Sequence, residues 1–252
     1  MAKARDMLTY TKKDYETKFA KKELFRKYPA EWIIRAHNMF VSKEAPTGRV
    51  LDYGCGSGNN SIFFIEKGYN TYGVDIATSA LDLIKQNLQW RRLDASLIKN
   101  FSVISPDVKR LPYEDGFFDV ILANGVLCYL SSEAHIRNMA KEFSRCLRPG
   151  GVVLITMIGP KHEWILYHAK QIHQGRIYEV SIDDPNNRLH GVHEFHYLVR
   201  DQEELKALFS EFECVTTGFY DQSMFDSKSS FHWIYAGRKP IRLGAQRRGS
   251  KR

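Results

Sequence analysis

Short apolar runs alternate with amphipathic stretches through the middle of the chain. The apolar runs lie at residues 49–54, 70–75, 101–104, 118–123 and 152–157. Runs of this length between more polar stretches predict buried strands. The stretches between them space their apolar residues as a helix does. This alternation predicts parallel β-α-β units and an α/β fold with a doubly wound sheet.

Capping residues place the helices between these strands. A helix over residues 60–67 ends at Gly68, which suits a C-cap. Thr78 can cap a second helix, and Ser131 or Ser132 can cap a third. The predicted inner faces are Leu81, Ile84 and Leu88 in the second helix, and Ile136, Met139, Ala140, Phe143 and Leu147 in the third. Both stripes follow the helical period.

The two ends of the chain add further elements. Residues 12–28 are polar and Lys-rich and predict a helix that is broken at Pro29, and residues 31–40 predict another. We group residues 1–46 as an N-terminal helical cap. Near the other end, Asp201-x-x-Glu204 resembles a capping box and precedes an apolar helical stripe. Two strands, 214–220 and 230–237, are expected after it.

Residues 159–199 do not fit the strand-helix alternation. We expect a helix over 163–173, a polar turn at 183–187 and an aromatic strand over 192–199. This insertion follows the fifth strand. Open α/β sheets bind ligands at the carboxyl ends of their strands. The insertion is therefore expected to cover the part of the site where a second ligand lies.

A glycine-rich loop follows the first strand. Gly54, Gly56 and Gly58 come directly after an apolar run, and Asp75 ends the second strand about 20 residues later. Glycine lets a backbone turn sharply and approach a ligand, and an acid at this spacing can accept ribose hydroxyls. Asp52, just before the first glycine, would repel a pyrophosphate but suits a cationic ligand. The pattern favours a nucleoside with an ammonium and a sulfonium group over a dinucleotide.

Four segments resemble the class I S-adenosylmethionine-dependent methyltransferases, in the order that this family shows. They are Val50–Gly58, Tyr72–Ile76, Asp107–Asn124 and Leu147–Ile155. The resemblance implies a seven-stranded, mostly parallel sheet with a reversed last strand pair, plus the insertion after strand five. It implies S-adenosyl-L-methionine as the cofactor and residues 47–240 as the methyltransferase domain.

The resemblance also implies cofactor contacts. Asp75, beside Ile76, would hold the ribose, and Asp107, beside Val108, would meet the adenine amino group. The remaining implied contacts are Asp52 with the cofactor's ammonium, Gly54, Gly56 and Gly58 under its methionine part, Asn124 and Gly125 at the end of strand four, and Tyr15 as an N-terminal aromatic. Helix packing is an equally good explanation for Tyr15.

No single catalytic residue is implied by the family, because the cofactor already carries an activated methyl group. A base is needed only for a weakly acidic hydroxyl or a protonated amine. Six of the nine histidines lie in the insertion, and we predict His193 and His196 as catalytic candidates. His190, His193 and His196 are three residues apart, but a strand would place His193 on the opposite face. We therefore predict no metal site.

Charge and cysteine content narrow the class of protein. The net charge of +8 is unevenly distributed. Residues 1–46 carry 11 Lys/Arg and 6 Asp/Glu, and residues 238–252 carry 7 Lys/Arg and no acids. Residues 47–237 carry 19 Lys/Arg and 23 Asp/Glu. Residues 241–252 are expected to be a basic, disordered tail, and whether this tail has a partner stays open. The four cysteines are scattered, and neither a signal peptide nor a membrane span is recognisable. We therefore expect a cytoplasmic protein with reduced thiols.

The sequence thus favours a methyltransferase for a small or glycan-like polar acceptor, which could be anionic, with transfer to oxygen. An RNA methyltransferase that uses the basic ends for phosphate contacts is the alternative. A protein that binds S-adenosylmethionine without catalysis is a third interpretation. The element after strand four lacks the Asn/Asp-Pro-Pro-Tyr/Phe motif of enzymes that methylate base amines or protein amides. The oligomeric state stays open.

Overall fold

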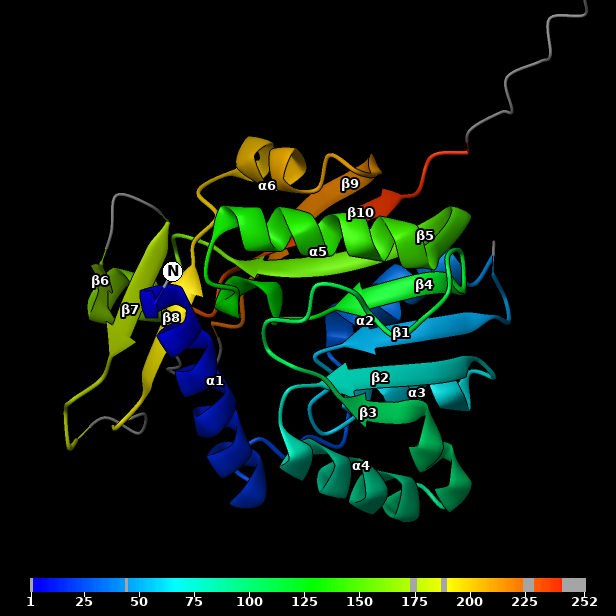
Figure 1. The fold of residues 1–252 in the computed structure, drawn as a ribbon, viewed down its shortest axis with the longest axis horizontal. Helices are drawn as coiled ribbons and strands as arrows, with labels where there is room; N and C mark the ends of the chain where they lie inside the picture. The colour runs from blue at the N-terminus through cyan, green and yellow to red at the C-terminus, as the bar shows by residue number, and fades with distance from the viewer. Residues whose placement is uncertain (1, 44, 173–175, 187–189, 224–228, 242–252) are drawn as a thin grey trace, which may run out of the picture.

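A computed structural model of the chain describes residues 2–43, 45–172, 176–186, 190–223 and 229–241. Its centre is a seven-stranded sheet in the order β3-β2-β1-β4-β5-β10-β9 (Figure 1). The strands are β1 (Arg49–Tyr53), β2 (Asn70–Asp75), β3 (Phe101–Val103), β4 (Phe118–Ala123), β5 (Leu147–Ile158), β9 (Glu213–Tyr220) and β10 (His232–Arg238). The first five are parallel, and β10 runs antiparallel to both β5 and β9. The predicted fold class is confirmed.

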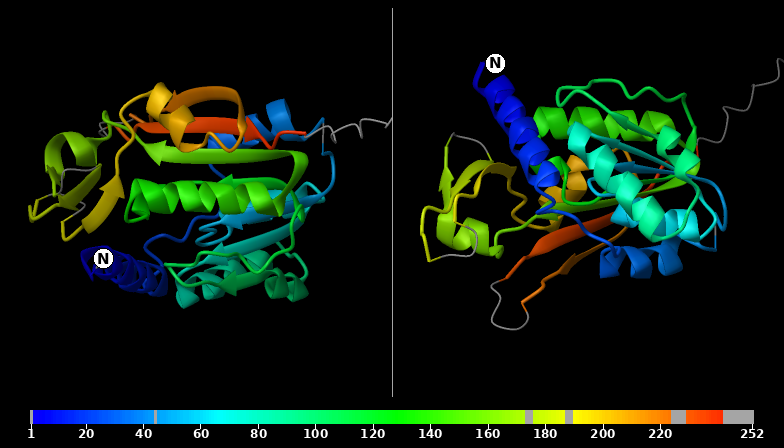
Figure 2. Two further views of the ribbon diagram at one scale, coloured as in Figure 1. Left: turned by 45° about the horizontal axis from the view of Figure 1, so that its top comes forward. Right: turned by 90° about the horizontal axis from the view of Figure 1, so that it is seen from below.

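Helices cover both faces of this sheet (Figure 2). They are α2 (Glu31–Ala36), α3 (Asn59–Glu66), α4 (Thr78–Trp90), α5 (Glu133–Cys146) and α6 (Gln202–Leu208), with short helical turns η1 (His37–Val41), η2 (Ala95–Asn100) and η3 (Leu127–Tyr129). Alternate residues of β4 pack on opposite sides. Ile121 and Ala123 join the cluster under α5 and α6, whereas Val120 and Leu122 join the cluster under α2 and α3. A strand buried on both faces explains why these runs are continuously apolar.

The N-terminal helix lies apart from the sheet. The predicted helix over 12–28 is wrong at both ends, because α1 spans Ala2–Ala20 and the chain then turns through Lys22, which has a φ of +60°. Figure 1 shows α1 crossing from the insertion to the start of α4. Phe19 near its end packs on Ala80 and Leu83 of α4. This apolar contact joins the end of α1 to α4.

The predicted cap of α4 is also wrong. Ala77 holds the N-cap position, and Thr78 is the first helical residue. The free backbone N–H groups of Thr78 and Ser79 donate to the carboxylate of Glu16, at 2.7 and 2.9 Å. A carboxylate at a helix N-terminus satisfies orphan donors and complements the helix dipole. Because this carboxylate belongs to α1, local sequence could not reveal it.

Two other predicted caps can be compared with the structure. Ser132 accepts the His135 N–H at 3.1 Å and starts α5 as predicted. Asp201 accepts the Glu204 N–H at 2.8 Å and starts α6. The returning half of a capping box is absent among the described contacts, because Glu204 accepts the backbone N–H of Arg200 instead.

The insertion forms a small antiparallel sheet of β6 (Ala169–Gln171), β7 (Ile177–Ser181) and β8 (His193–Tyr197). The strand predicted over 192–199 is confirmed by β8. The helix predicted over 163–173 is wrong, because a single π-helical turn, η4 (Trp164–His168), leads directly into β6. Pairing of Ala169 with Val180 of β7 takes up the backbone groups that a helix would have needed. The pattern gave no signal for β7.

The domain boundaries predicted from sequence remain predictions. Of the expected basic tail, residues 241–252, the structure describes residue 241, and residues 242–252 lie outside the described residues. Within the described part of the chain, no helix has the length and apolar character needed to cross a membrane.

Candidate active site

The carboxyl ends of β1, β2 and β4 open into a cavity of about 470 Å³. One part is lined by the glycine loop and the ends of β2 and β4, and we call it the glycine half. The other part lies under the insertion, and we call it the histidine half. It contains Tyr129, His162, Glu163, Trp164, His196 and His232. Helix α1 contributes a wall to the same cavity through Leu8, Thr11, Tyr15 and Phe19.

The glycine loop requires its glycines. Gly54, Gly56 and Gly58 have φ values of +72°, +50° and +76°, which side-chain-bearing residues rarely adopt. A Cβ atom on Gly54 would also lie 2.4 Å from a methyl group of Val126. Gly54 and Gly56 line the cavity, whereas a Cβ on Gly58 would meet Ile84 of α4. Gly58 therefore allows the loop to pack on α4 and does not line the cavity.

Asp75 lies where its spacing predicted. Its two carboxylate oxygens accept the backbone N–H groups of Gly56 and Ala77, at 2.8 and 3.0 Å. Burial raises the pKa of this carboxyl, and those backbone donors oppose the rise. The carboxylate lines the cavity beside Ile76, with each oxygen retaining a lone pair for a ligand hydroxyl. The geometry fits the ribose contact that the family implies.

Asp52 lies behind the loop and does not line the cavity among the described residues. One oxygen accepts the Ser61 hydroxyl at 2.6 Å, and the other is buried without a hydrogen-bond partner in the described structure. Burial raises the pKa of Asp52 to about 7. An unpaired buried carboxylate of this kind is stabilised by a cation nearby. Its effect on a ligand would be exerted through the electric field.

Asn124 and Gly125 line the cavity at the end of β4. The Asn124 side-chain oxygen accepts hydrogen bonds from Trp32 Nε1 at 3.2 Å and from Thr156 Oγ1 at 3.1 Å. The Gly125 N–H donates to Thr156 Oγ1 at 2.8 Å. These contacts hold the Asn124 side chain in the core, so the backbone of this turn is what faces a ligand.

The remaining residues predicted to contact the cofactor lie on the loop after β3 and on α1. Asp107 accepts the Ser105 hydroxyl and, like Val108, is not among the residues that line the cavity. Ile104 and Pro106 of the same loop do line it. Tyr15 lines the cavity from α1, with its ring 5.3 Å from the Tyr129 ring in an edge contact.

Glu194 of β8 is the most strongly connected acid of the histidine half. Its carboxylate lies 2.5 Å from Lys18 Nζ and 2.9 Å from His196 Nε2, and it accepts the Tyr129 hydroxyl at 3.1 Å. Burial favours the neutral carboxyl, but the contacts with His196 and Lys18 outweigh burial and lower the pKa of Glu194 to about 2. Sequence reasoning missed this residue. The available signal was strand periodicity, which places Glu194 and His196 on one face.

His196 is 1 % exposed and lines the cavity between two aromatic rings. Its ring centre lies 4.7 Å from that of Tyr129 and 5.5 Å from that of Trp164. Neither ring nitrogen makes a hydrogen bond with the described residues, although Nε2 is at ion-pair distance from Glu194. A buried ring nitrogen without a partner is costly, so a ligand group at Nδ1 would satisfy it.

Two further histidines of this half are held as neutral rings. Burial lowers the pKa of His162 to about 3 and that of His232 to about 4. His162 Nδ1 accepts the Trp164 N–H at 3.1 Å, so its proton lies on Nε2. His232 Nδ1 donates to the Ser230 carbonyl at 2.8 Å, so its Nε2 carries the lone pair. The pair offers one donor and one acceptor to a ligand, with ring centres 5.2 Å apart.

His193, the other predicted catalytic residue, lies outside this cavity. Its side chain is on the opposite face of β8, where Nε2 is 2.8 Å from Glu179 and the ring packs against Tyr10. These residues line a separate surface groove together with Phe195. The alternation of side chains along a strand explains why His193 and His196 point apart. The placement of His193 argues against the role predicted for it.

Residues 51–155 match a family model described as a methyltransferase domain. Over these residues the chain is similar to the methyltransferase family that its sequence motifs resemble. It is 29 % identical to the mRNA cap guanine-N(7) methyltransferase of Schizosaccharomyces pombe, over 68 % of this chain and 51 % of that one. It is 26 % identical to a malonyl-[acyl-carrier protein] O-methyltransferase of Legionella pneumophila, over 44 % and 37 %. The chain thus spans about half or less of the length of these two relatives.

Solved methyltransferases share the fold at low identity. A Methanosarcina mazei S-adenosylmethionine-dependent methyltransferase superposes with a TM-score of 0.64 at 19 % identity, covering 85 % of this chain and 99 % of its own. The Burkholderia thailandensis 1,6-didemethyltoxoflavin-N1-methyltransferase, solved with S-adenosylhomocysteine, gives 0.63 at 16 %, with 94 % and 90 % covered. The cofactor of this methyltransferase family, S-adenosyl-L-methionine, fits the glycine half by its chemistry: the Asp75 carboxylate can accept the ribose hydroxyls, and the buried Asp52 behind the loop favours a cation in the cavity.

Proposed function

We propose that this methyltransferase transfers a methyl group from S-adenosyl-L-methionine to a hydroxyl oxygen of a small, uncharged, glycan-like acceptor. The observation that carries the proposal is the shared cavity. The glycine half, with Asp75, and the unpartnered ring of His196 line one continuous space. A donor bound on one side and an acceptor bound on the other would therefore be in reach of each other.

The residues of the chain supply position and proton transfer. S-adenosyl-L-methionine, when bound, supplies an activated methyl group. Asp75 and the glycine loop would fix its ribose and orient it toward the histidine half. Aromatic walls from Tyr129 and Trp164 would hold the acceptor and exclude water. Holding two reactants in a fixed orientation, in a cavity without water, accounts for a large part of the rate increase that an enzyme gives to a group transfer.

His196 would accept the proton of the acceptor hydroxyl at Nδ1. Glu194 lies behind the ring at Nε2, 2.9 Å away, and its negative charge would stabilise the imidazolium that forms. A histidine oriented by a carboxylate is a common general base. Because the pKa of Glu194 is lowered to about 2, its carboxylate keeps this charge at all physiological pH values.

The charge of the histidine half favours an uncharged acceptor. Glu163 is an acid that lines this half, Glu194 lies behind His196 with Lys18 as its counter-ion, and His162 and His232 are neutral at physiological pH because burial lowers their pKa values to about 3 and 4. Arg26 is the lining residue with a fixed positive charge among those described. Such a surface has more acceptors than donors, which suits hydroxyl groups and disfavours a phosphate or carboxylate. We therefore replace the earlier anionic alternative with a neutral acceptor.

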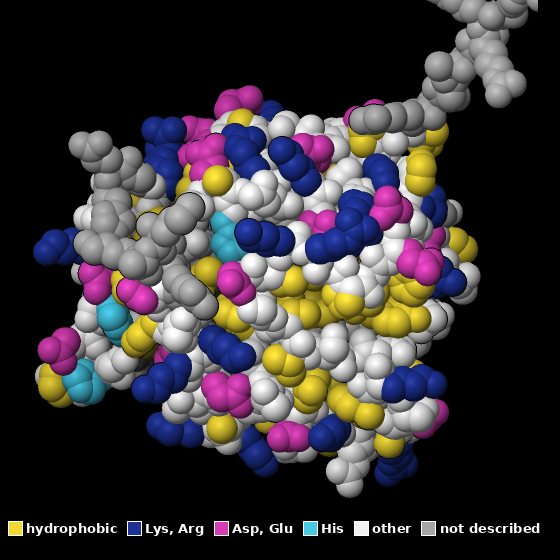
Figure 3. Space-filling view, viewed as in Figure 1, with side chains coloured by type: hydrophobic (Ala, Val, Ile, Leu, Met, Phe, Trp, Pro, Cys, Tyr) yellow, Lys and Arg dark blue, Asp and Glu magenta, His cyan; other side chains and the backbone are white. Residues whose placement is uncertain are grey.

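An RNA acceptor is the second candidate, and the similarity to an mRNA cap methyltransferase favours it. RNA binding would require a basic surface near the cavity. On the face in Figure 3, Lys and Arg side chains lie among Asp and Glu side chains and form no continuous basic area. This distribution supports the small acceptor for the described part of the chain.

A panel of matched acceptors tests the proposal. Transfer of labelled methyl groups would be measured to glucose, glucosamine, glucuronate, glucose 6-phosphate and a short capped RNA. We expect transfer to the uncharged sugar to exceed transfer to the two anionic sugars by at least about tenfold, since each buried acid repels an anion. Preferential methylation of the anionic sugars or of the RNA would contradict it.

A further inference from the structure

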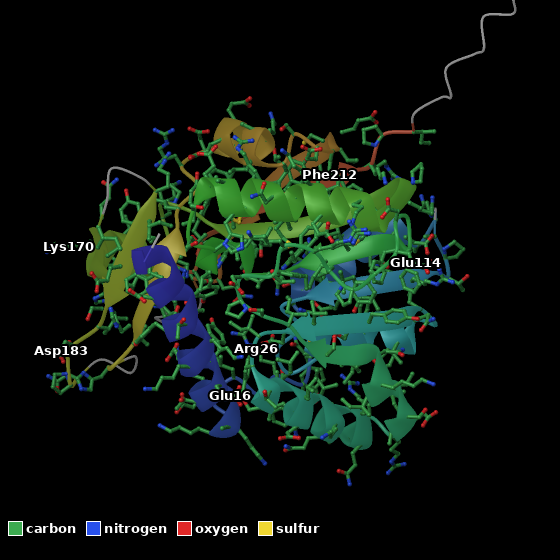
Figure 4. All side chains as sticks on the ribbon, viewed as in Figure 1. Glu16, Arg26, Glu114, Lys170, Asp183 and Phe212 are labelled. Atoms are coloured by element: carbon green, nitrogen blue, oxygen red, sulfur yellow. The ribbon has the colours of Figure 1, made fainter. Side chains whose placement is uncertain are left out.

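Helix α1 connects the two halves of the cavity through charged side chains. Near its end, Glu16 accepts the first N–H groups of α4, and α4 follows directly after Asp75. Two residues later, Lys18 reaches across to Glu194 of the insertion. Figure 1 shows the helix between these two elements, and Figure 4 shows Glu16 and Arg26 in the space between α1 and α4. The helix thus holds both sides at once.

The contact between Lys18 and Glu194 is a buried ion pair. Lys18 Nζ lies 2.5 Å from Glu194 and 2.6 Å from Asp14, and the Lys18 side chain is only 16 % exposed. Buried charges depend on their partners, because removing one partner leaves an uncompensated charge. Exposed pairs contribute little, but this pair has two acids around one cation in a shielded place.

We propose that Lys18 is a positioning residue that sets the charge balance at Glu194 whenever α1 lies against the cavity. When α1 covers the glycine half, Lys18 at the same time balances the charge of Glu194 behind the base, His196. The inference rests on the proposed function only in its assignment of His196 as the base. The connection of α1 to both halves stands on contacts that do not involve an acceptor.

The groups around Glu194 explain how this coupling works. Lys18 and Asp14 approach from α1, Tyr129 from η3, and His196 from β8, while the Tyr15 ring lies nearby on α1. With α1 in place, Lys18 balances the carboxylate, and His196 is free to accept a proton. With α1 displaced, the full negative charge acts on His196 and favours its protonated form, which cannot act as a base.

Three variants separate this role from general packing. Lys18→Met removes the charge and keeps the length, Lys18→Arg keeps the charge, and Lys13→Met makes the same change at an exposed position of α1. Stopped-flow measurement of S-adenosylhomocysteine release should show about tenfold faster dissociation for Lys18→Met, as expected when a buried pair on the covering helix is broken. Lys18→Arg should restore most of the wild-type rate, and Lys13→Met should match wild type.

The pH profile of methyl transfer is a second measurement. A substitution that only disturbs packing would not shift this profile along the pH axis. Lys18→Met should shift the rising limb of the profile to higher pH, because His196 then keeps its proton longer. In a Glu194→Gln background, Lys18→Met should change neither release nor profile further. Wild-type release together with an unshifted profile in folded Lys18→Met would overturn the inference. Failure of the proposed function would instead appear as full activity in His196→Asn, with the effect on release unchanged.

Discussion

The two halves of the cavity are built in different ways. The glycine half comes mainly from residues 53–76, joined by the end of β4, and its contacts are made largely by backbone groups and by Asp75. The histidine half is assembled from η3, η4, β8 and β10, which are far apart along the chain, and its contacts are made by side chains. A nucleoside site can therefore be fixed locally, whereas an acceptor site depends on the whole fold.

The halves also differ in electrostatics. In the glycine half, an acid is held by two backbone N–H groups, one from the glycine loop and one from the turn that follows the acid. In the histidine half, the acid is held by a lysine from α1, a tyrosine and a histidine. Backbone donors cannot be changed by most substitutions, but side-chain partners can. The acceptor site is therefore the part that can diverge while the fold and cofactor site are kept.

The strongest way to break the glycine half is to add one methyl group. Gly54→Ala would place a Cβ 2.4 Å from Val126 at a left-handed φ. We expect S-adenosylhomocysteine affinity to fall by more than about 100-fold, because strain and overpacking together cost roughly 3 kcal/mol or more. Gly68→Ala is the matched control, since it has a similar φ but open space around it. Calorimetry should find unchanged binding for the control.

Removing the ribose contact should have the next largest effect. Asp75→Asn keeps the shape but removes the charge from two hydrogen-bonded oxygens. We expect S-adenosylhomocysteine binding to weaken by about 1–3 kcal/mol. Asp82→Asn, on the exposed face of α4, changes an acid paired with Lys85 and should leave binding unchanged. Equal losses in both variants would mean that Asp75 does not contact the cofactor.

Asp52 should make cofactor binding depend on pH. Its pKa is raised to about 7, so the buried neutral form predominates below that pH and the carboxylate above it. We expect S-adenosylmethionine affinity to increase severalfold as pH rises from 6 to 8, while S-adenosylhomocysteine, which lacks the sulfonium charge, responds less. Asp52→Asn should abolish the difference. A raised pKa also means that the stability supplied by this group is lost as pH rises from about 4 toward 7.

That stability change gives a second measurement on Asp52. Asp52→Asn mimics the neutral carboxyl, so thermal unfolding of the variant should not show the loss between about pH 4 and 7 that the wild type shows. If wild type and variant have parallel stability curves across this range, folding does not raise the pKa of Asp52, and the predicted pH dependence of S-adenosylmethionine binding is wrong.

The smallest effect is expected at the C-terminus. Truncation after Ile241 removes most of the basic residues of the tail. Transfer to a small acceptor depends on the cavity, so its rate should stay within about twofold of wild type at low and moderate salt. A large loss on truncation, together with activity of the full chain that falls steeply as salt rises, would point to RNA and would favour the second candidate.

The sequence placed Gly54, Gly56 and Asp75 at the same end of the sheet because the determinants of that placement are local. Glycines at fixed offsets and an acid at the end of the next strand specify a turn and its ligand directly. Sequence reasoning also predicted His196 and His193 as catalytic residues, but the His193 side chain points away from the cavity. It missed Glu194, His232 and Lys18. Their importance follows from contacts between β8, β10 and α1. Local patterns do not encode such contacts, and they gave no signal for β7 either.

The most direct test of the account compares two histidines that are three residues apart. His196→Asn should bind S-adenosylhomocysteine as wild type does but transfer methyl groups about 100-fold or more slowly, as expected when a general base is lost. His193→Asn should match wild type in both binding and transfer, because its ring faces the groove with Glu179. If His196→Asn keeps full transfer, or if His193→Asn loses it, the assignment of the histidine half as the acceptor site is wrong.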